Sequence, residues 1–226
     1  MISVAIDGPS GAGKSSMAKR LAAELGYAYV DTGAMYRSIG LYALRAGRDP
    51  KDEPAVAALL PQIKLDIRLL DGVQHIYLNG EDVSDAIRTE SCGMAASAVA
   101  VHPCVRTFLL QTQRDLAASR DVLMDGRDVG TVILPDATVK IYLTASAEAR
   151  ATRRLAELRE KGQQADFKTV LKDILQRDEQ DIHRPVAPLR RAEDAVLVDT
   201  SDIGIEASLA LLKKTILRGI QTQGTV

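Results

Sequence analysis

Residues 8–15 read Gly8-Pro9-Ser10-Gly11-Ala12-Gly13-Lys14-Ser15 and fit the pattern G-x-x-x-x-G-K-[ST] at every position. An apolar run at 3–7 precedes this stretch, and an amphipathic segment at 15–25 follows it. Glycines let the backbone turn so that successive N–H groups face phosphate oxygens, and the helix N-terminus adds partial positive charge. We therefore expect Lys14 to reach the β- and γ-phosphates of a nucleoside triphosphate and the Ser15 hydroxyl to ligate Mg²⁺.

Short apolar runs alternate with longer amphipathic segments, as is typical of parallel strands joined by helical crossovers. Strand candidates lie at 3–7, 28–31, 122–125, 138–143 and 195–199. Helix candidates lie at 15–25, 34–46, 104–118, 147–160, 167–183 and 205–220. Glycines expected to form left-handed caps follow some of these helices, at Gly26, Gly47 and Gly162. The sequence therefore predicts an α/β fold with a P-loop NTPase-type parallel sheet flanked by helices.

The segment 64–80 departs from this alternation of strands and helices. Residues 64–70 and 74–78 alternate or nearly alternate in polarity, with Asp71-Gly72 between them and Asn79-Gly80 after them. Both dipeptides are strong turn signals. We expect a small antiparallel hairpin inserted into the α/β core, and a frayed tail after Ile220.

Composition restricts the function classes. The 226 residues include 29 basic and 30 acidic side chains, for a net charge of -1. This balance argues against a general nucleic-acid or membrane binder, and no apolar run approaches the roughly 20 residues of a membrane helix. We expect a soluble cytoplasmic protein, monomeric by default, without a signal peptide. Its cysteines are interpreted as packing residues, and its histidines, lacking a paired carboxylate or metal-like spacing, receive no catalytic role.

A triphosphate site alone is common to kinases, GTPase switches and mechanical ATPases. The N-K-x-D motif of guanine-binding GTPases is absent from the sequence. A kinase also needs a site for the acceptor, and the segment Asp31-Thr32-Gly33-Ala34-Met35-Tyr36-Arg37 is a candidate. Tyr36 and Arg37 lie within one turn of the start of the expected helix, where a sugar or base and a phosphate can bind. Capping of the helix by Asp31 or Thr32 is an equally good interpretation.

A second candidate, Asp125-Gly126-Arg127-Asp128-Val129-Gly130-Thr131, follows the strand at 122–125, where open α/β sheets bind ligands. Asp125 is placed to hold Mg²⁺ through water, Arg127 to clamp a phosphate, and Asp128 to accept from an exocyclic amine. A salt-bridged turn is the alternative interpretation.

A third candidate lies on the helix expected at 167–183. The spacing of Arg177, Asp181 and Arg184 places them on one stripe, beside an apolar stripe of Leu171, Ile174, Leu175 and Ile182. The preceding helix carries Arg150, Arg153 and Arg154. Such a hairpin of helices is suited to closing over phosphates, because arginine binds phosphate oxygens bidentately. Ion-pair support on a solvated face is the alternative.

These motifs together resemble one family. GPSGAGKS, DTGAMYR, the hairpin, DGRDVGT and RDEQDIHRPVAPL occur in the order and approximate spacing of bacterial-type cytidylate kinases, over roughly residues 2–218. The resemblance implies transfer of the γ-phosphoryl group of MgATP to CMP or dCMP. It also implies a core at 1–62, 90–147 and 186–226, an acceptor-binding β-hairpin insert at 63–89 and a mobile helical lid at 148–185.

The resemblance further implies roles for individual residues. ATP would be bound by the loop Gly8, Pro9, Ser10, Gly11, Ala12, Gly13, Lys14, Ser15 and Ser16. The acceptor phosphate would be clamped by Arg37, Arg127 and Arg184. The cytosine would be read by Ser97, Arg106 and Asp128, with Thr32 beside them. The pentose would be contacted by Tyr36, Arg177 and Asp181. The transferring phosphoryl group would be met by the lid arginines, Arg153 and Arg154.

Some of these positions have plainer interpretations. Thr32 stands where serine is common in the family, and its extra methyl group bears on base or sugar tolerance. From the residues alone, Ser97 is equally a buried helix serine, and Arg106 is a helix-surface charge. The competing functions are a kinase for another monophosphate such as UMP, and a nucleotide-dependent switch protein.

Overall fold

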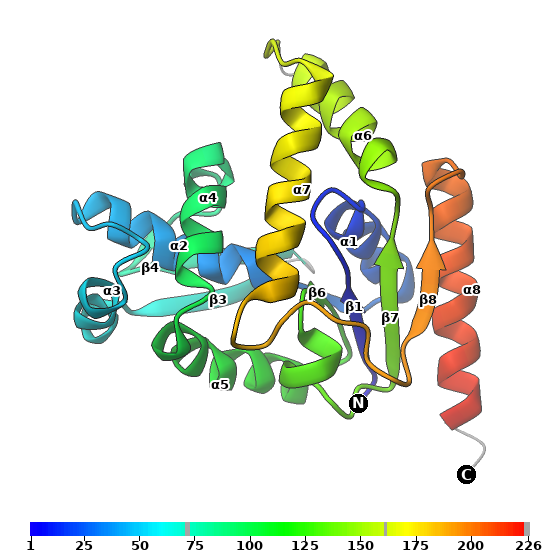
Figure 1. The fold of residues 1–226 in the computed structure, drawn as a ribbon. Coiled ribbons are helices and arrows are strands. Elements are labelled where there is room, and N and C mark those ends of the chain that lie inside the picture. The colour runs from blue at the N-terminus through cyan, green and yellow to red at the C-terminus, as the bar shows by residue number, and fades with distance from the viewer. Residues whose placement is uncertain (71–72, 161, 224–226) are drawn as a thin grey trace. The chain divides into compact units, whose positions relative to one another are not determined.

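The computed structural model describes residues 1–70, 73–160 and 162–223 (Figure 1). The chain divides into two compact units. The first unit contains Met1 and Ala22–Met124, and the second contains Ile2–Leu21 and the chain from Asp125 onward.

The main sheet has five strands in the order β2-β6-β1-β7-β8. Their bounds are Ser3–Asp7 for β1, Ala28–Asp31 for β2, Val122–Gly126 for β6, Val139–Thr144 for β7 and Val196–Asp199 for β8. Strand β7 pairs in parallel with β1, with Val4 opposite Val139, and with β8, with Tyr142 opposite Leu197. Strands β2 and β6 are buried along their whole length, as expected of parallel strands that are covered on both faces. The predicted α/β fold with a parallel sheet is confirmed.

The first unit contains a small antiparallel sheet of order β3-β4-β5 together with helices. The helices are α2 at Thr32–Arg45, α3 at Glu53–Leu59, α4 at Glu90–Val99 and α5 at Pro103–Ser119, with 3-10 turns at Leu60–Gln62 and Ala86–Arg88. The strands are β3 at Leu65–Leu70, β4 at Val73–Leu78 and β5 at Glu81–Asp82. The predicted hairpin is therefore present with one further short strand. The turn predicted at Asp71-Gly72 lies outside the described residues.

Helices α2 and α4 pack closely because one residue at their contact has no side chain. A Cβ atom on Gly40 would lie 2.8 Å from the Cβ atom of Ala95 and 3.0 Å from its backbone carbonyl carbon. The two helices begin at side-chain caps: Asp31 Oδ1 accepts from the N–H of Ala34 in α2, and Thr89 Oγ1 accepts from the N–H of Cys92 in α4. Of the two alternatives for the start of α2, Asp31 is the cap and Thr32 is the first helical residue.

The second unit contains the helices that follow strands β1, β7 and β8 along the chain. They are the main part of α1, which spans Lys14–Leu25, then α6 at Ala147–Glu160, α7 at Phe167–His183 and α8 at Ile205–Gln223. A π-helix spans Val129–Ile133. Helix α7 ends before Pro185, because a residue that precedes proline disfavours the helical conformation. Helix α8 continues to Gln223, so the prediction that the chain frays after Ile220 is wrong for residues 221–223.

Helices α6 and α7 pack through Ala151, Val170 and Ile174. Leu171 contributes to this cluster, but Leu175 and Ile182 are 52% and 45% exposed. The apolar stripe therefore packs against α6 at Leu171 and Ile174, whereas its last two members face solvent. The glycines expected in left-handed caps do have positive φ, 72° at Gly26, 63° at Gly47 and 70° at Gly162.

Among the described residues, no single helix combines the length and the apolar composition needed to cross a membrane. Helices α4 and α5 have this length and composition only when they are counted together, and they are bent by 102° relative to each other.

Candidate functional site

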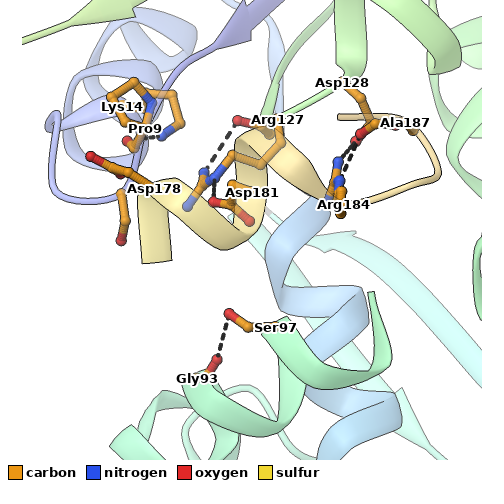
Figure 2. Close-up of polar contacts among 12 residues, drawn as sticks. Pro9, Lys14, Gly93, Ser97, Arg127, Asp128, Asp178, Asp181, Arg184 and Ala187 are labelled. Atoms are coloured by element: carbon orange, nitrogen blue, oxygen red, sulfur yellow. Dashed lines mark hydrogen bonds and ion pairs between the residues drawn. The ribbon is translucent and has the colours of Figure 1, made fainter. Parts of the chain in front are cut away.

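The loop between β1 and α1 has the shape that its glycines allow. Gly8 has φ of 152°, and a Cβ atom there would lie 1.9 Å from the carbonyl oxygen of Leu143, so only glycine fits. Lys14, the first residue of α1, donates from Nζ to the carbonyl oxygen of Pro9 at 2.8 Å (Figure 2). The lysine therefore lies across the loop that we expect to receive the phosphates.

Lys14 is 5% exposed and lies among several charges. Burial, together with the positive charge of Arg127, lowers the pKa of Lys14 to about 7, against the opposing effects of Asp125, Asp181 and Asp7. A buried ammonium group that lacks full compensation favours binding of an anion, because the anion restores the charged form. The charge of Arg127 acts on Lys14, and the two side chains lie in the same part of the site (Figure 2).

Ser15 and Asp125 form the part of the site that could hold a metal ion. The Ser15 hydroxyl donates to Oδ2 of Asp125 at 2.7 Å, and Asp125 is 3% exposed. Among residues 1–70, 73–160 and 162–223, no group of three or more His, Cys, Asp or Glu side chains could form a protein metal cage. Mg²⁺ in phosphate-transfer sites uses few protein oxygens, because substrate phosphates and waters complete its shell. A hydroxyl beside one buried carboxylate fits this ion.

Two further ion pairs surround the segment after β6. Arg127 donates from Nε to Oδ2 of Asp181 at 2.7 Å, and Arg184 donates from Nη2 to Oδ1 of Asp128 at 3.1 Å (Figure 2). Arg184 is the extended residue after the end of α7. Asp181 and Arg184 thus bond to the 127–128 segment, so the alternative of ion pairs confined to a solvated helix face does not describe them. Arg177 is half-buried on the same helix.

Asp7, at the end of β1, organises the same segment and has no motif that singles it out. Its carboxylate accepts from the backbone N–H groups of Val129 and Gly130, at 2.8 and 2.7 Å. These bonds hold the first turn of the π-helix that follows Asp128. Burial raises the pKa of Asp7 to about 6, although both N–H donors favour the charged form. Sequence reasoning missed this residue because the bonds span 122 and 123 positions.

Arg150 on α6 connects two other parts of the site by hydrogen bonds. It donates to both carboxylate oxygens of Asp178 on α7, at 3.0 and 2.6 Å, and to the carbonyl oxygen of Ser10 at 2.9 Å. Its side chain is 6% exposed. Unlike the closing role predicted for the arginines of this helix, Arg150 bonds the phosphate loop directly to α7.

The other two arginines of α6 have different surroundings. Arg153 donates to Oγ1 and the carbonyl oxygen of Thr200 and to the carbonyl oxygen of Ile203. Arg154 forms a surface pair with Glu157 at 3.2 Å.

The first unit holds the other expected binding residues. The guanidinium carbon of Arg106 lies 5.6 Å from the centroid of the Tyr36 ring, and the two residues are 8% and 7% exposed. Arg106 is therefore not a helix-surface charge, and it also donates to the carbonyl oxygen of Ala100. Ser97 is half-buried on α4 and donates to the carbonyl oxygen of Gly93 at 3.4 Å (Figure 2). Thr32 is 3% exposed.

The structure also shows the surroundings of the histidines and cysteines. His75 lies 3.2 Å from Asp82, and His183 lies 3.1 Å from Glu179. The prediction that the histidines lack a paired carboxylate is therefore wrong for these two, although both pairs are at the surface. The two cysteines, Cys92 and Cys104, are free.

A phosphate loop whose lysine shares its surroundings with additional guanidinium groups suits an enzyme that holds two phosphate-bearing substrates at once. The fold and this site together define a P-loop kinase. A family model described as cytidylate kinase matches residues 4–217, and the chain belongs to the cytidylate kinase family.

Relatives and a solved structure agree with this placement. The chain is 47% identical to the cytidylate kinase of Caldicellulosiruptor bescii over 92% of each sequence. It is 48% identical to the cytidylate kinase of Nocardia farcinica, over 97% of this chain and 95% of the relative. A crystal structure of an uncharacterized protein from Eubacterium ventriosum aligns with a TM-score of 0.53 at 13% identity, covering 96% of this chain and 98% of that one. This last likeness concerns the fold alone.

Proposed function

We propose that the protein transfers the γ-phosphoryl group of MgATP to CMP or dCMP, which gives ADP and CDP or dCDP. The observation that carries the proposal is the placement of Arg127 beside the buried Lys14 of the phosphate loop. A protein that only binds or hydrolyses a triphosphate needs the lysine. A second fixed cation beside it can neutralise the phosphoryl group in transfer or bind the phosphate of an acceptor, and a protein that only binds a triphosphate needs neither.

The residues of the second unit supply charge neutralisation and positioning. Lys14 contacts the β- and γ-phosphates. Ser15 and Asp125 would hold Mg²⁺, which would neutralise phosphate charge. Arg127 and Arg184 bind the acceptor phosphate, while Arg153 and Arg154 meet the phosphoryl group in transfer. The acceptor oxygen is already anionic near neutral pH, so no strong general base is required. Catalysis then rests on alignment and on electrostatic stabilisation of the transition state.

The nucleoside-recognising residues are proposed from their positions in the family motifs. Arg37 binds the acceptor phosphate, Tyr36, Arg177 and Asp181 contact the pentose, and Ser97, Arg106, Asp128 and Thr32 surround the cytosine. The burial of both Tyr36 and Arg106 supports this assignment, because a buried guanidinium beside an aromatic ring can bind a flat polar base. The acceptor-binding insert at 63–89 and the lid at 148–185 belong to the same proposal. The monomeric state and the cytoplasmic location stay predictions.

The test is ADP production from MgATP with CMP, dCMP, UMP, AMP, GMP and dTMP offered separately. We expect strong turnover with CMP and dCMP and little with the other four. Preference for UMP would keep the kinase and overturn the cytosine contacts of Ser97, Arg106 and Asp128. No ADP production with any of the six, together with stoichiometric ATP binding, would favour the switch protein.

Two variants and a control test the roles of the cations. Lys14→Ala and Arg127→Ala should keep the fold and lose transfer by about a thousandfold. Arg48→Ala, at an exposed position outside the proposed site, should keep full activity. A substantially active Lys14→Ala enzyme would contradict the role given to that residue.

A further inference from the structure

Gln74, on strand β4 of the small antiparallel sheet, holds the backbone of Asp31 at the end of β2. The N–H of Asp31 donates to Oε1 of Gln74 at 2.6 Å, and Nε2 of Gln74 donates to the carbonyl oxygen of Asp31 at 3.3 Å. The two residues are 9% and 6% exposed. One amide side chain therefore satisfies both backbone groups of Asp31, from a strand 43 positions away.

The two carboxylate oxygens of Asp31 accept hydrogen bonds from different donors. Oδ1 accepts from the N–H of Ala34 at 2.9 Å and caps α2, and Oδ2 accepts from Nη2 of Arg37 at 2.6 Å. Gly33 leaves room for this arrangement, because a Cβ atom there would lie 3.2 Å from both Arg37 Nη1 and Asp31 Oδ1. The Asp31 carboxylate is thus fixed on three sides, by the helix start, by Gln74 through the backbone, and by Arg37.

Arg37 retains unused hydrogen-bonding capacity in this arrangement. Its Nε is buried and finds no hydrogen-bond partner among the described residues. A guanidinium group has five N–H donors in a rigid fork, and the Asp31 bond occupies one of them. A buried donor without a partner costs free energy, and the oxygen of a bound anion would remove that cost.

We propose that Asp31 and Gln74 are positioning residues for the acceptor phosphate. Gln74 fixes Asp31, and Asp31 fixes the guanidinium group of Arg37 so that its remaining donors are in place before the phosphate binds. The antiparallel sheet thereby contributes to phosphate affinity without touching the phosphate. This inference rests on the proposed role of Arg37 at the acceptor phosphate.

Preorganisation is the physical reason why a carboxylate can assist here. Arginine has a long side chain, and ordering it on binding reduces affinity. Asp31 orders it in advance through a single bond. Because the Asp31 carboxylate is itself held by the helix start, it acts as a fixed support for Arg37.

The test compares Asp31→Asn and Gln74→Leu with the wild-type enzyme by steady-state kinetics. Asp31→Asn keeps an acceptor oxygen for the cap but loses the charged bond to Arg37. We expect its KM for CMP to rise about tenfold, and that of Gln74→Leu about threefold. The kcat and the KM for MgATP should stay within about twofold in both. If Asp31→Asn does not fold, Gln74→Leu, which keeps the cap and the ion pair, carries the test.

The matched control is Asp52→Asn. Asp52 caps α3 by accepting from the N–H of Ala55 at 3.1 Å, as Asp31 caps α2. Its KM for CMP should equal the wild-type value. A raised KM in this control would mean that replacing a capping carboxylate by an amide, and not loss of Arg37 positioning, explains the effect.

A double variant identifies the route of the effect. In an Arg37→Met background, Asp31→Asn should raise the KM for CMP no further, because its action passes through Arg37. If Asp31→Asn raised the KM for CMP equally with and without Arg37, the inference would be overturned. An unchanged or lower KM for CMP in both Asp31→Asn and Gln74→Leu would overturn it as well. A wild-type protein that does not phosphorylate CMP would instead overturn the proposed function. A normal KM in Arg37→Met alone would overturn the role of Arg37 and this inference with it.

Discussion

Arg184 donates from Nη2 to Oδ1 of Asp128 at 3.1 Å, and the two side chains are only 4% and 5% exposed. The bond joins the end of α7 to the segment after β6, 56 positions away. Both charges are removed from water, so this bond compensates part of the cost of burying them. The pair therefore contributes to the fold of the second unit as well as to the proposed phosphate clamp.

Asp128→Asn should lower the free energy of unfolding by about 3 kcal/mol, because it leaves the Arg184 charge buried without its counter-charge. Urea unfolding monitored by circular dichroism would measure this. Asp136→Asn, at an exposed position two residues after the π-helix cap, should change stability by less than about 0.5 kcal/mol. A double variant, Asp128→Asn with Arg184→Met, should regain part of the loss, and equal losses in the single and double variants would contradict the explanation.

The pH dependence of ATP binding should follow Lys14. Its pKa is lowered to about 7, so the ligand-free protein loses this positive charge as the pH rises through 7. We expect the KM for MgATP to rise between pH 7 and pH 8, by at most about tenfold. Lys14→Arg should lower kcat but remove this rise relative to wild type, because arginine stays charged. Lys19→Arg, at an exposed position on α1, should retain the wild-type profile, and parallel profiles in all three proteins would contradict the role of Lys14.

Asp7 should make stability depend on pH in the acid range. Its pKa is raised from 3.8 to about 6 in the folded protein, so the folded state binds the proton more tightly than the unfolded state. The stability contributed by protonated Asp7 is complete below pH 3.8 and is lost as the pH rises through 6, by about 3 kcal/mol over that window. Asp7→Asn lacks this titration. The difference in unfolding free energy between wild type and variant, measured by urea titration from pH 4 to pH 7, should fall with rising pH, and a constant difference would refute the assignment.

Packing between α2 and α4 can be tested at two glycines. Gly40→Ala places a Cβ atom 2.8 Å from that of Ala95, and we expect a loss of about 1–2 kcal/mol in spite of the better helix propensity. Gly93→Ala on α4 meets nothing within 4 Å and should stabilise by about 0.5–1 kcal/mol. Thermal unfolding of both variants gives the comparison, and equal effects would show that the helices adjust to the added methyl group.

The strands, the phosphate loop and most helices could be predicted because each has a local signal. Strand β1 is a short apolar run followed directly by the glycine pattern, and α7 has a cap at Asp166 and a proline just after its end. Helix α4 also begins at a cap, Thr89, but it has no clear apolar period and was not predicted. Its sequence ESCGMAASAV consists largely of small residues, so the apolar period that marks a helix is weak.

The pairings within the site could not be predicted from the sequence. Arg127 and Asp181 are 54 positions apart, and Arg150 and Asp178 are 28 apart. Residue type suggests that an arginine will find a carboxylate, but only the fold decides which one. The same holds for Gln74, whose amide has no motif and whose partner is a backbone. Helix periodicity placed Arg184 on the face of α7, whereas it lies beyond the helix end, in extended conformation.

The arginines proposed to bind the acceptor phosphate each have a carboxylate partner within 3.1 Å: Asp31 for Arg37, Asp181 for Arg127 and Asp128 for Arg184. At a distance greater than the Debye length of about 8 Å, such pairs produce little net field. The rate of encounter with an anionic nucleotide should therefore vary only weakly with ionic strength. Anions are then distinguished only after they reach the site, where individual hydrogen bonds act, and not while they approach through solution.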